Sequence, residues 1–178
     1  MKKTVFLPLI AIALAALILF GISFALNGIA NKNAQAAHLK DLQTLLPGST
    51  EFTLEAYDGE DANIRSVHKG ETGFVIETVT AGYAGDITML IGVSTKGSVT
   101  GLVVREMSET LGLGAQVLTD WEFLTQFLGS TGDAEVGTNV DAITGATVTS
   151  KAIARSINSA VAYVTGADID SGATAWGG

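Results

Sequence analysis

The chain has 178 residues, enough for one membrane-spanning segment and one domain with its own hydrophobic core. It contains no cysteine, which excludes disulfides, thiolate zinc sites and cysteine-held iron–sulfur clusters. From residue 41 onward the chain holds all 18 acidic residues and six of the ten basic ones, a net charge of −12. Because nucleic-acid binding rests largely on basic side chains, we expect no nucleic-acid partner.

Residues 5–26 carry no charge, and as a helix they would be about 33 Å long, which matches the hydrocarbon core of a bilayer. We therefore predict that residues 1–30 form a cytoplasmic N-terminus and a single transmembrane anchor. Lys2 and Lys3 precede the apolar run, so the positive-inside rule places the rest of the chain outside the cytoplasm. A cleaved signal peptide is the alternative, because residues 34–36 (Ala-Gln-Ala) form an acceptable cleavage site.

Residues 31–48 carry alanines and leucines at roughly helical spacing and end in Pro47-Gly48, which stops a helix. This pattern predicts a juxtamembrane helix or linker. His38 and His68 are isolated from other metal-ligating residues, so we expect no metal site.

Residues 49–168 are predicted to form one extracytoplasmic domain of the α+β class, with an antiparallel sheet and packed helices. Five segments rich in Val, Ile, Thr and aromatic residues are bounded by Gly or Asp turns. Gly97 lies in a short turn between the last two and predicts a hairpin. The predicted strands cover residues 52–57, 63–69, 73–81, 87–94 and 98–106.

Two amphipathic helices are expected after the strands. The first covers residues 120–128, begins at a Thr119 or Asp120 cap, and places an apolar face in the core. The second runs from Thr149 or Ser150 to residue 165, and residues 169–178 are expected to be a flexible tail. Gly166 is the natural C-cap of the second helix. The apolar face of the first helix consists of Trp121, Phe123, Leu124, Phe127 and Leu128.

Residues 141–150 combine hydroxyl side chains with a small Gly-Ala pair and lie directly before the second helix. The N-terminus of a helix suits an anion such as phosphate, because its first N–H groups have no intrahelical acceptor. A helix cap at Thr147 is the simpler interpretation. The longer string Asp-x-x-Thr-Gly-Ala-Thr-x-Thr resembles the flavinylation motif of the FMN-binding domain family. The resemblance implies that Thr147 carries FMN through a phosphoester bond, made by a separate flavin transferase that uses FAD as donor.

Two further segments resemble the same family, and more narrowly the G subunits of the Rnf complex. They are a Gly-Tyr-x-Gly segment at 82–85 and Glu-Met-Ser-Glu-Thr-Leu-Gly-Leu-Gly at 106–114. Leu111 stands where the family often has Pro. Asp141 is expected either to orient the loop of the motif as a hydrogen-bond acceptor or to act while the transferase is bound, and a solvated helix charge is an equal alternative for Lys151. The resemblance implies cofactor contacts from Gly82, Tyr83, Gly85, Glu109, Thr110, Leu111, Gly112, Leu113, Gly114, Thr144, Gly145, Ala146, Thr147, Val148 and Lys151.

The resemblance also implies a function. It is that of a membrane-anchored electron carrier with no substrate chemistry of its own, one component of an ion-translocating oxidoreductase between reduced ferredoxin and NAD. Other subunits and the lipid bilayer would be its partners. The C subunit of the sodium-translocating NADH:quinone oxidoreductase shares these features and is an alternative. A flavin-free anchored structural or binding domain is another. A hydrolase with Thr147 as nucleophile is disfavoured, because no base is evident near it.

Overall fold

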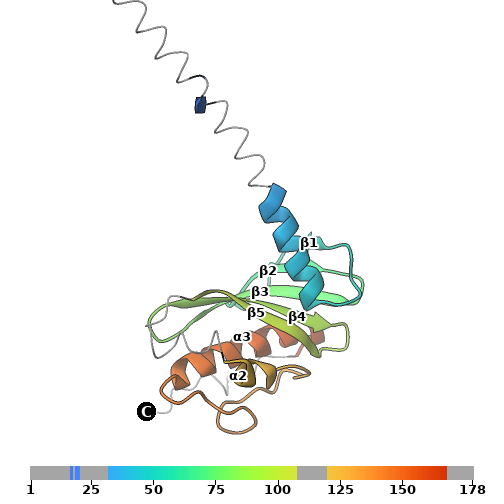
Figure 1. Cartoon of the computed structure of the whole chain (residues 1–178). Coiled ribbons are helices and arrows are strands. Elements are labelled where there is room, and N and C mark those ends of the chain that lie inside the picture. Colours follow the sequence, from blue (N-terminus) through green and yellow to red (C-terminus); the bar gives the residue numbers. More distant parts are fainter. Residues whose placement is uncertain (1–16, 18, 21–31, 108–119, 168–178) are drawn as a thin grey trace, which may run out of the picture. The chain divides into compact units, whose positions relative to one another are not determined.

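The computed structural model describes residues 17, 19, 20, 32–107 and 120–167. The chain divides into two compact units, Met1–Lys40 and Asp41–Gly178, and the second unit contains a five-stranded antiparallel sheet whose strands follow chain order (Figure 1). This arrangement confirms the predicted α+β class and meander, with each strand within two residues of its predicted bounds. The strands are β1 (Thr53–Glu55), β2 (Ile64–Lys69), β3 (Gly73–Ala81), β4 (Asp86–Ser94) and β5 (Val99–Met107).

Two helices, α2 (Trp121–Thr125) and α3 (Thr147–Thr165), cover the same face of the sheet (Figure 1). Because successive side chains of a strand point to opposite faces, Ile76, Met89 and Ile91 face these helices. They form one core cluster with buried residues of both helices, including Phe123, Phe127, Ile153 and Ile157.

The opposite face of the sheet is covered by the end of a helix that spans residues 32–45. Leu42, Leu45 and Leu46 are buried there and pack against Val75 and Leu90. The contact is close because two paired strand positions are glycines. A Cβ on Gly92 would lie 2.1 Å from the carbonyl oxygen of Leu45, and one on Gly101 would lie 3.2 Å from the Leu45 Cα. The Thr100 hydroxyl also donates a hydrogen bond to that carbonyl oxygen at 2.6 Å.

The predicted apolar face of residues 120–128 is wrong in two positions. Phe123 and Phe127 are buried, but Trp121 is 76% exposed and Leu128 is 50% exposed. The α-helix is only five residues long, Trp121–Thr125, so helical spacing does not turn both of these side chains toward the sheet. Asp120, one of the two predicted caps, is the N-cap, and its side chain accepts a hydrogen bond from the Phe123 N–H at 2.9 Å.

No helix within the described residues combines the length and the apolarity that crossing a membrane requires. The predicted anchor at residues 5–26 falls almost entirely outside the described residues, as does the predicted tail at 169–178.

Hydrogen bonds to Glu71 join the turn between β2 and β3 to the segment that precedes β1. The Glu71 carboxylate accepts hydrogen bonds from the Thr50 N–H at 3.0 Å and from the Thr50 hydroxyl at 3.1 Å. Hydrogen bonds from the backbone of Glu71 itself and from Thr50 lower the pKa of the Glu71 carboxyl below its ordinary value. A lowered folded-state pKa stabilises the protein above the unfolded pKa, and this contribution is lost as the pH falls through the folded value.

We therefore expect Glu71→Gln to lower the free energy of unfolding at pH 7, and the difference from wild type to be lost as the pH falls below the ordinary glutamate pKa of about 4.3 and through the lowered pKa of Glu71. Urea unfolding at several pH values measures it. In a Thr50→Ala background the effect of Glu71→Gln at pH 7 should be smaller, since the shared hydrogen bonds are already weakened. An effect that does not change with pH would contradict this role of the carboxylate.

Candidate functional site

The motif at 141–149 forms a tight turn that leads directly into α3. The Ala146 N–H donates to the Ile143 carbonyl oxygen at 2.9 Å, which closes a four-residue turn. Gly145 is the third residue of this turn and has a φ of 82°, a conformation that side-chain-bearing residues rarely adopt. Ala146 is buried, with 4% of its surface exposed, so a small residue is required at this position as well. The Gly-Ala pair of the motif is thus explained by local geometry.

Helix α3 begins at Thr147, two or three residues earlier than the predicted start at Thr149 or Ser150. The N-cap is Ala146, which makes no side-chain capping bond, and the first helical hydrogen bond joins the Ser150 N–H to the Ala146 carbonyl at 2.9 Å. The prediction was wrong because Thr149 and Ser150 are typical capping residues, yet both are buried inside the first turn. Thr147 is therefore the first helical residue and does not cap the helix.

The Ser150 side chain holds the turn against the helix. Its hydroxyl accepts a hydrogen bond from the Ile143 N–H at 3.3 Å and donates one to the Ala146 carbonyl at 3.0 Å. Sequence reasoning did not assign this role, because a serine inside a helix gives no local signal of a bond to a preceding loop. The two bonds fix the position of Thr147 relative to the turn.

A groove of about 360 Å³ lies between the motif and α2. The Gln126 side chain joins its two walls, because its oxygen accepts a hydrogen bond from the Asp141 N–H at 2.8 Å. Sequence reasoning also missed Gln126. Asp141 takes part in holding the loop through its backbone rather than through its exposed carboxylate. The groove is lined by Asp120, Glu122, Phe123, Gln126, Asp141, Ala142, Ile143 and Thr144.

The start of α3 has the features of an anion site. Thr144 and Thr147 are exposed, and the first turn of the helix contains no acidic residue. The positive end of the helix dipole and the first backbone N–H groups favour a negative group beside Thr147. Lys151 is exposed one helical turn after Thr147, a spacing that places the two side chains on the same side of the helix.

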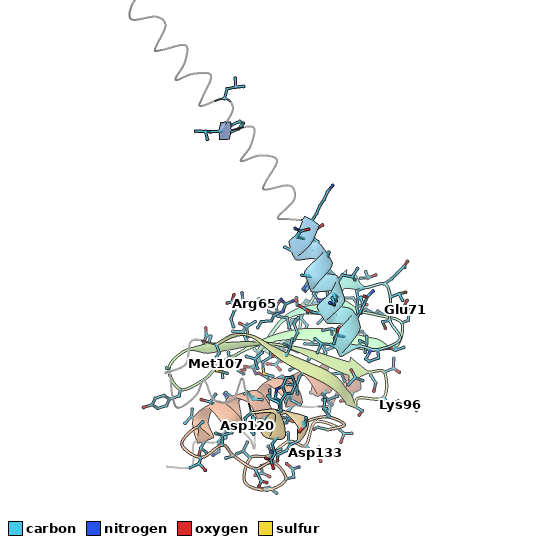
Figure 2. All side chains as sticks on the ribbon, in the orientation of Figure 1. Arg65, Glu71, Lys96, Met107, Asp120 and Asp133 are labelled. Atoms are coloured by element: carbon cyan, nitrogen blue, oxygen red, sulfur yellow. The ribbon has the colours of Figure 1, made fainter. Side chains whose placement is uncertain are left out.

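The turn between β3 and β4 and the last residue of β5 lie at one end of the sheet. Ala81 pairs with Asp86 on either side of that turn, and Ile87 pairs with Met107. Figure 2 shows Met107 at the end of the sheet opposite Lys96, which lies in the β4–β5 turn.

Helix α3 starts toward this same end of the sheet. The Tyr163 ring packs edge-on against Phe74 near the start of β3, with ring centres 5.8 Å apart, whereas Ser156 is hydrogen-bonded to Thr80 near the end of β3. The helix therefore runs from the β3–β4 turn toward the β4–β5 turn, and Thr147 marks its beginning.

The structure thus brings together part of the predicted site. Gly82 donates its N–H to the Gly85 carbonyl at 2.8 Å in the β3–β4 turn, and Tyr83 between them is 70% exposed. The predicted contacts at 109–114 lie outside the described residues. The predicted residues that lie at the start of α3 are Thr144, Gly145, Ala146, Thr147, Val148 and Lys151.

No group of His, Asp or Glu suited to a metal ion occurs among the residues that the structure describes.

Replacing Ser150 with alanine should loosen the motif. The Ile143 N–H and the Ala146 carbonyl each lose a hydrogen bond, which should lower the free energy of unfolding by about 1–2 kcal/mol. Urea unfolding measures the change, with Thr144→Ala as the control, because Thr144 is exposed. Equal stabilities of the two variants would contradict the clamping role of Ser150.

Comparisons with known proteins agree with this arrangement. Residues 82–162, which run from the β3–β4 turn through most of α3, match the FMN-binding domain family. The chain is 35% identical over 123 residues to the G subunit of the Na(+)-translocating ferredoxin:NAD(+) oxidoreductase complex of Acetobacterium woodii, a match that covers 62% of this chain and 55% of that protein. It is also 35% identical over 99 residues to the proton-translocating counterpart of Clostridium ljungdahlii, covering 52% of this chain and 53% of that protein. The chain thus spans about half the length of these two relatives.

A third relative is matched over nearly its whole length. The G subunit of the ion-translocating oxidoreductase complex of Methanosarcina acetivorans is 32% identical over 175 residues, a match that covers 90% of this chain and 93% of that protein. With the FMN-binding domain placed on the sheet and α3, this similarity shows that the chain belongs to the family of G subunits of ion-translocating oxidoreductase (Rnf) complexes.

Proposed function

We propose that this protein is a membrane-anchored electron carrier in an ion-translocating ferredoxin:NAD oxidoreductase complex, with FMN bound covalently through a phosphoester to Thr147. Its FMN domain, residues 49–168, would lie outside the cytoplasm, held by a single-pass anchor within residues 1–30. Other subunits of the complex, a flavin transferase during maturation and the lipid bilayer are its expected partners. The ferredoxin:NAD(+) oxidoreductase complexes named for the Acetobacterium and Clostridium relatives support this assignment.

One observation carries the proposal. Thr147 is an exposed hydroxyl residue at the first position of a 19-residue helix whose N-cap makes no side-chain hydrogen bond. A phosphate esterified to this hydroxyl would lie beside the first helical N–H groups and the positive end of the dipole. The residues present therefore fit the phosphate of FMN.

The surrounding residues have separate tasks in this proposal. The turn closed by Ile143 and Ala146 holds the backbone before Thr147 in a fixed conformation, and Gly145 lets the transferase approach it closely. Lys151 offsets the charge of the phosphate. When bound, FMN accepts and passes on electrons. The protein contributes attachment, orientation and charge.

The ring of the flavin would lie at the end of the sheet where α3 begins. The β3–β4 turn presents the exposed Tyr83 there, and β5 ends there at Met107, from which the chain enters the glycine-rich segment 109–114. Backbone amides of that segment would bind the polar edge of the ring, and Leu111 and Leu113 would pack on its apolar parts.

The test is the mass of the full-length chain, purified from a host that supplies the flavin transferase and then denatured. We expect one FMN less one water per chain, together with flavin fluorescence that survives gel electrophoresis under denaturing conditions. The same chain from a host without the transferase should have its plain polypeptide mass. A colourless, unmodified chain from a host that flavinylates a control protein would instead support a flavin-free binding domain.

A further inference from the structure

A second cavity, of about 510 Å³, lies between the loop that joins β1 to β2 and the later turns of α3. It shares no residue with the groove beside the motif. Arg155, Ser159 and Tyr163 follow one another at four-residue spacing and line one wall, which extends for about 12 Å along the helix. The opposite wall is the loop at 57–64.

The loop wall is held in shape by its own side chains. The Tyr57 hydroxyl accepts a hydrogen bond from the Asp61 N–H at 3.0 Å and donates one to the Asp61 carbonyl at 3.3 Å. Asp61 Oδ1 accepts from the Asn63 N–H at 2.9 Å, and the Asn63 amide donates to the Ser159 hydroxyl at 3.2 Å. The cavity is therefore bounded by two walls that are fixed to each other.

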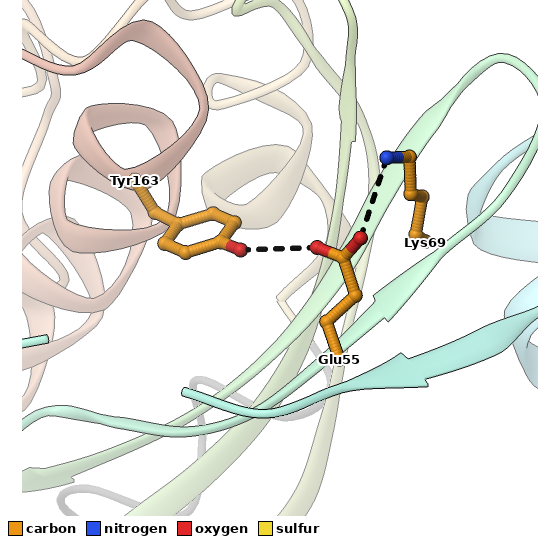
Figure 3. A network of polar contacts seen from close by, with 3 residues as sticks. All are labelled: Glu55, Lys69 and Tyr163. Carbon is orange, nitrogen blue, oxygen red and sulfur yellow. Dashed lines mark hydrogen bonds and ion pairs between the residues drawn. The ribbon is translucent and has the colours of Figure 1, made fainter. Parts of the chain in front are cut away.

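Tyr163 lies at the end of the row of α3 residues that line the cavity, and its ring packs edge-on against Tyr57, with ring centres 5.8 Å apart. Figure 3 shows that its hydroxyl donates to the Glu55 carboxylate, at 3.3 Å. Lys69 pairs with the same carboxylate at 3.3 Å. Burial and the adjacent Glu55 charge raise the pKa of Tyr163, so its hydroxyl stays protonated and keeps this bond at neutral pH. The polar groups at this aromatic end of the cavity thus have partners within the chain and need no ligand.

Two charged side chains of the cavity, in contrast, contain atoms that have no hydrogen-bond partner. Within the described part of the chain, Arg155 Nε and Asp61 Oδ2 are both buried without a hydrogen-bond partner. Buried polar atoms of charged groups normally have partners, because leaving one unpaired costs much of its lost hydration. Arg155 and Asp61 line the same cavity with opposite charges, and neither forms an ion pair within the described residues, so both side chains are available to a ligand of complementary charge.

We propose that this cavity binds a small zwitterion of the amino-acid class, whose carboxylate pairs with Arg155 and whose ammonium group pairs with Asp61. A purely anionic ligand would face Asp61 and Glu60, and a purely cationic one would face Arg155. A molecule with both charges satisfies both walls. Its methylene chain would pack between Tyr57 and Ala162.

The experiment uses the full-length flavinylated chain and three probes of matched size, 6-aminohexanoate, hexanoate and hexylamine, with glycine and 4-aminobutanoate to vary the charge separation. Titration calorimetry measures affinity, and backbone amide NMR shifts at Asn63 and Ser159 locate binding. We expect saturable binding of at least one zwitterion, about tenfold or more tighter than either singly charged probe. The same titration on a Thr147→Ala chain tests the cavity without covalent flavin.

Two charge-removing variants separate a ligand contact from a structural role. Arg155→Gln should weaken zwitterion binding about tenfold while sparing hexylamine, and Asp61→Asn should weaken it while sparing hexanoate. Asn keeps the oxygen that accepts from Asn63 N–H, so the loop is retained. Lys96→Gln, in the β4–β5 turn and outside the cavity, should leave zwitterion binding unchanged. Absence of saturable binding by any probe, or equal affinities across the variants, would overturn the proposal.

Discussion

Thr147→Ala is expected to remove all covalently bound flavin and to leave the fold intact. The substitution removes the hydroxyl group of the first residue of α3, so the phosphoester cannot form there. Thr147 is exposed and alanine is a better helix former, so the stability should change by less than about 0.5 kcal/mol. In-gel flavin fluorescence and urea unfolding measure the two quantities on the same preparation.

Two variants control for indirect effects. Thr147→Ser keeps a hydroxyl at the same helical position and should retain covalent flavin. Thr144→Ala removes the other exposed hydroxyl of the motif and should reduce the yield without abolishing it. Wild-type fluorescence in Thr147→Ala would mean that another residue carries the cofactor.

Gly92→Ala is expected to destabilise the domain by about 3 kcal/mol or more, a large effect for one methyl group. The new Cβ would lie 2.1 Å from the Leu45 carbonyl oxygen and 2.8 Å from its carbonyl carbon. Both atoms belong to the backbone, so the clash cannot be relieved by a side-chain rotation. The segment at 41–46 would have to move off the sheet and expose Leu42, Leu45 and Leu46, at a cost of roughly 1.5–3 kcal/mol for each fully exposed side chain.

Gly101→Ala is the matched control, because Gly101 pairs with Gly92 on the neighbouring strand and faces the same segment. Its Cβ would lie 3.2 Å from Leu45, a contact that a shift of a few tenths of an ångström relieves, so the expected loss is about 1 kcal/mol. Urea unfolding ranks the two variants, and amide hydrogen exchange at Leu45 and Leu46 reports whether the segment has left the sheet. Equal destabilisation would contradict the close contact at Gly92.

The sheet could be predicted from the sequence because its signals are local. Val, Ile and Thr alternate along the strands, and Gly97, with a φ of 78°, makes the β4–β5 turn that its position predicted. Burial of the individual side chains was less predictable. Trp121 looks like a core residue by its apolarity, but its place at the first position of a five-residue helix leaves it in solvent. The roles of Gly92 and Gly101 depend on Leu45, which is far from them in the chain.

In the candidate site, too, the local features could be predicted from the sequence, and the contacts between residues apart in the chain could not. The motif itself could be recognised from the sequence. The structure explains its two small residues, because Gly145 has a positive φ and Ala146 is buried. The bonds that hold the motif, from Ser150 to Ile143 and from Gln126 to Asp141, join residues 7 and 15 positions apart and carry no sequence signature. The cavity between the loop at 57–64 and α3 was not predicted at all, because its walls meet only after the sheet has formed.

The most direct test of the central claim is to locate the flavin on the chain. Digestion of the flavinylated protein with trypsin and an Asp-specific protease gives the peptide 141–151, which contains four hydroxyl residues, Thr144, Thr147, Thr149 and Ser150. Fragmentation of this peptide by mass spectrometry should place FMN less one water on Thr147 alone. The same mass on any of the other three residues, or an unmodified peptide from a preparation that is fluorescent under denaturing conditions, would contradict the account.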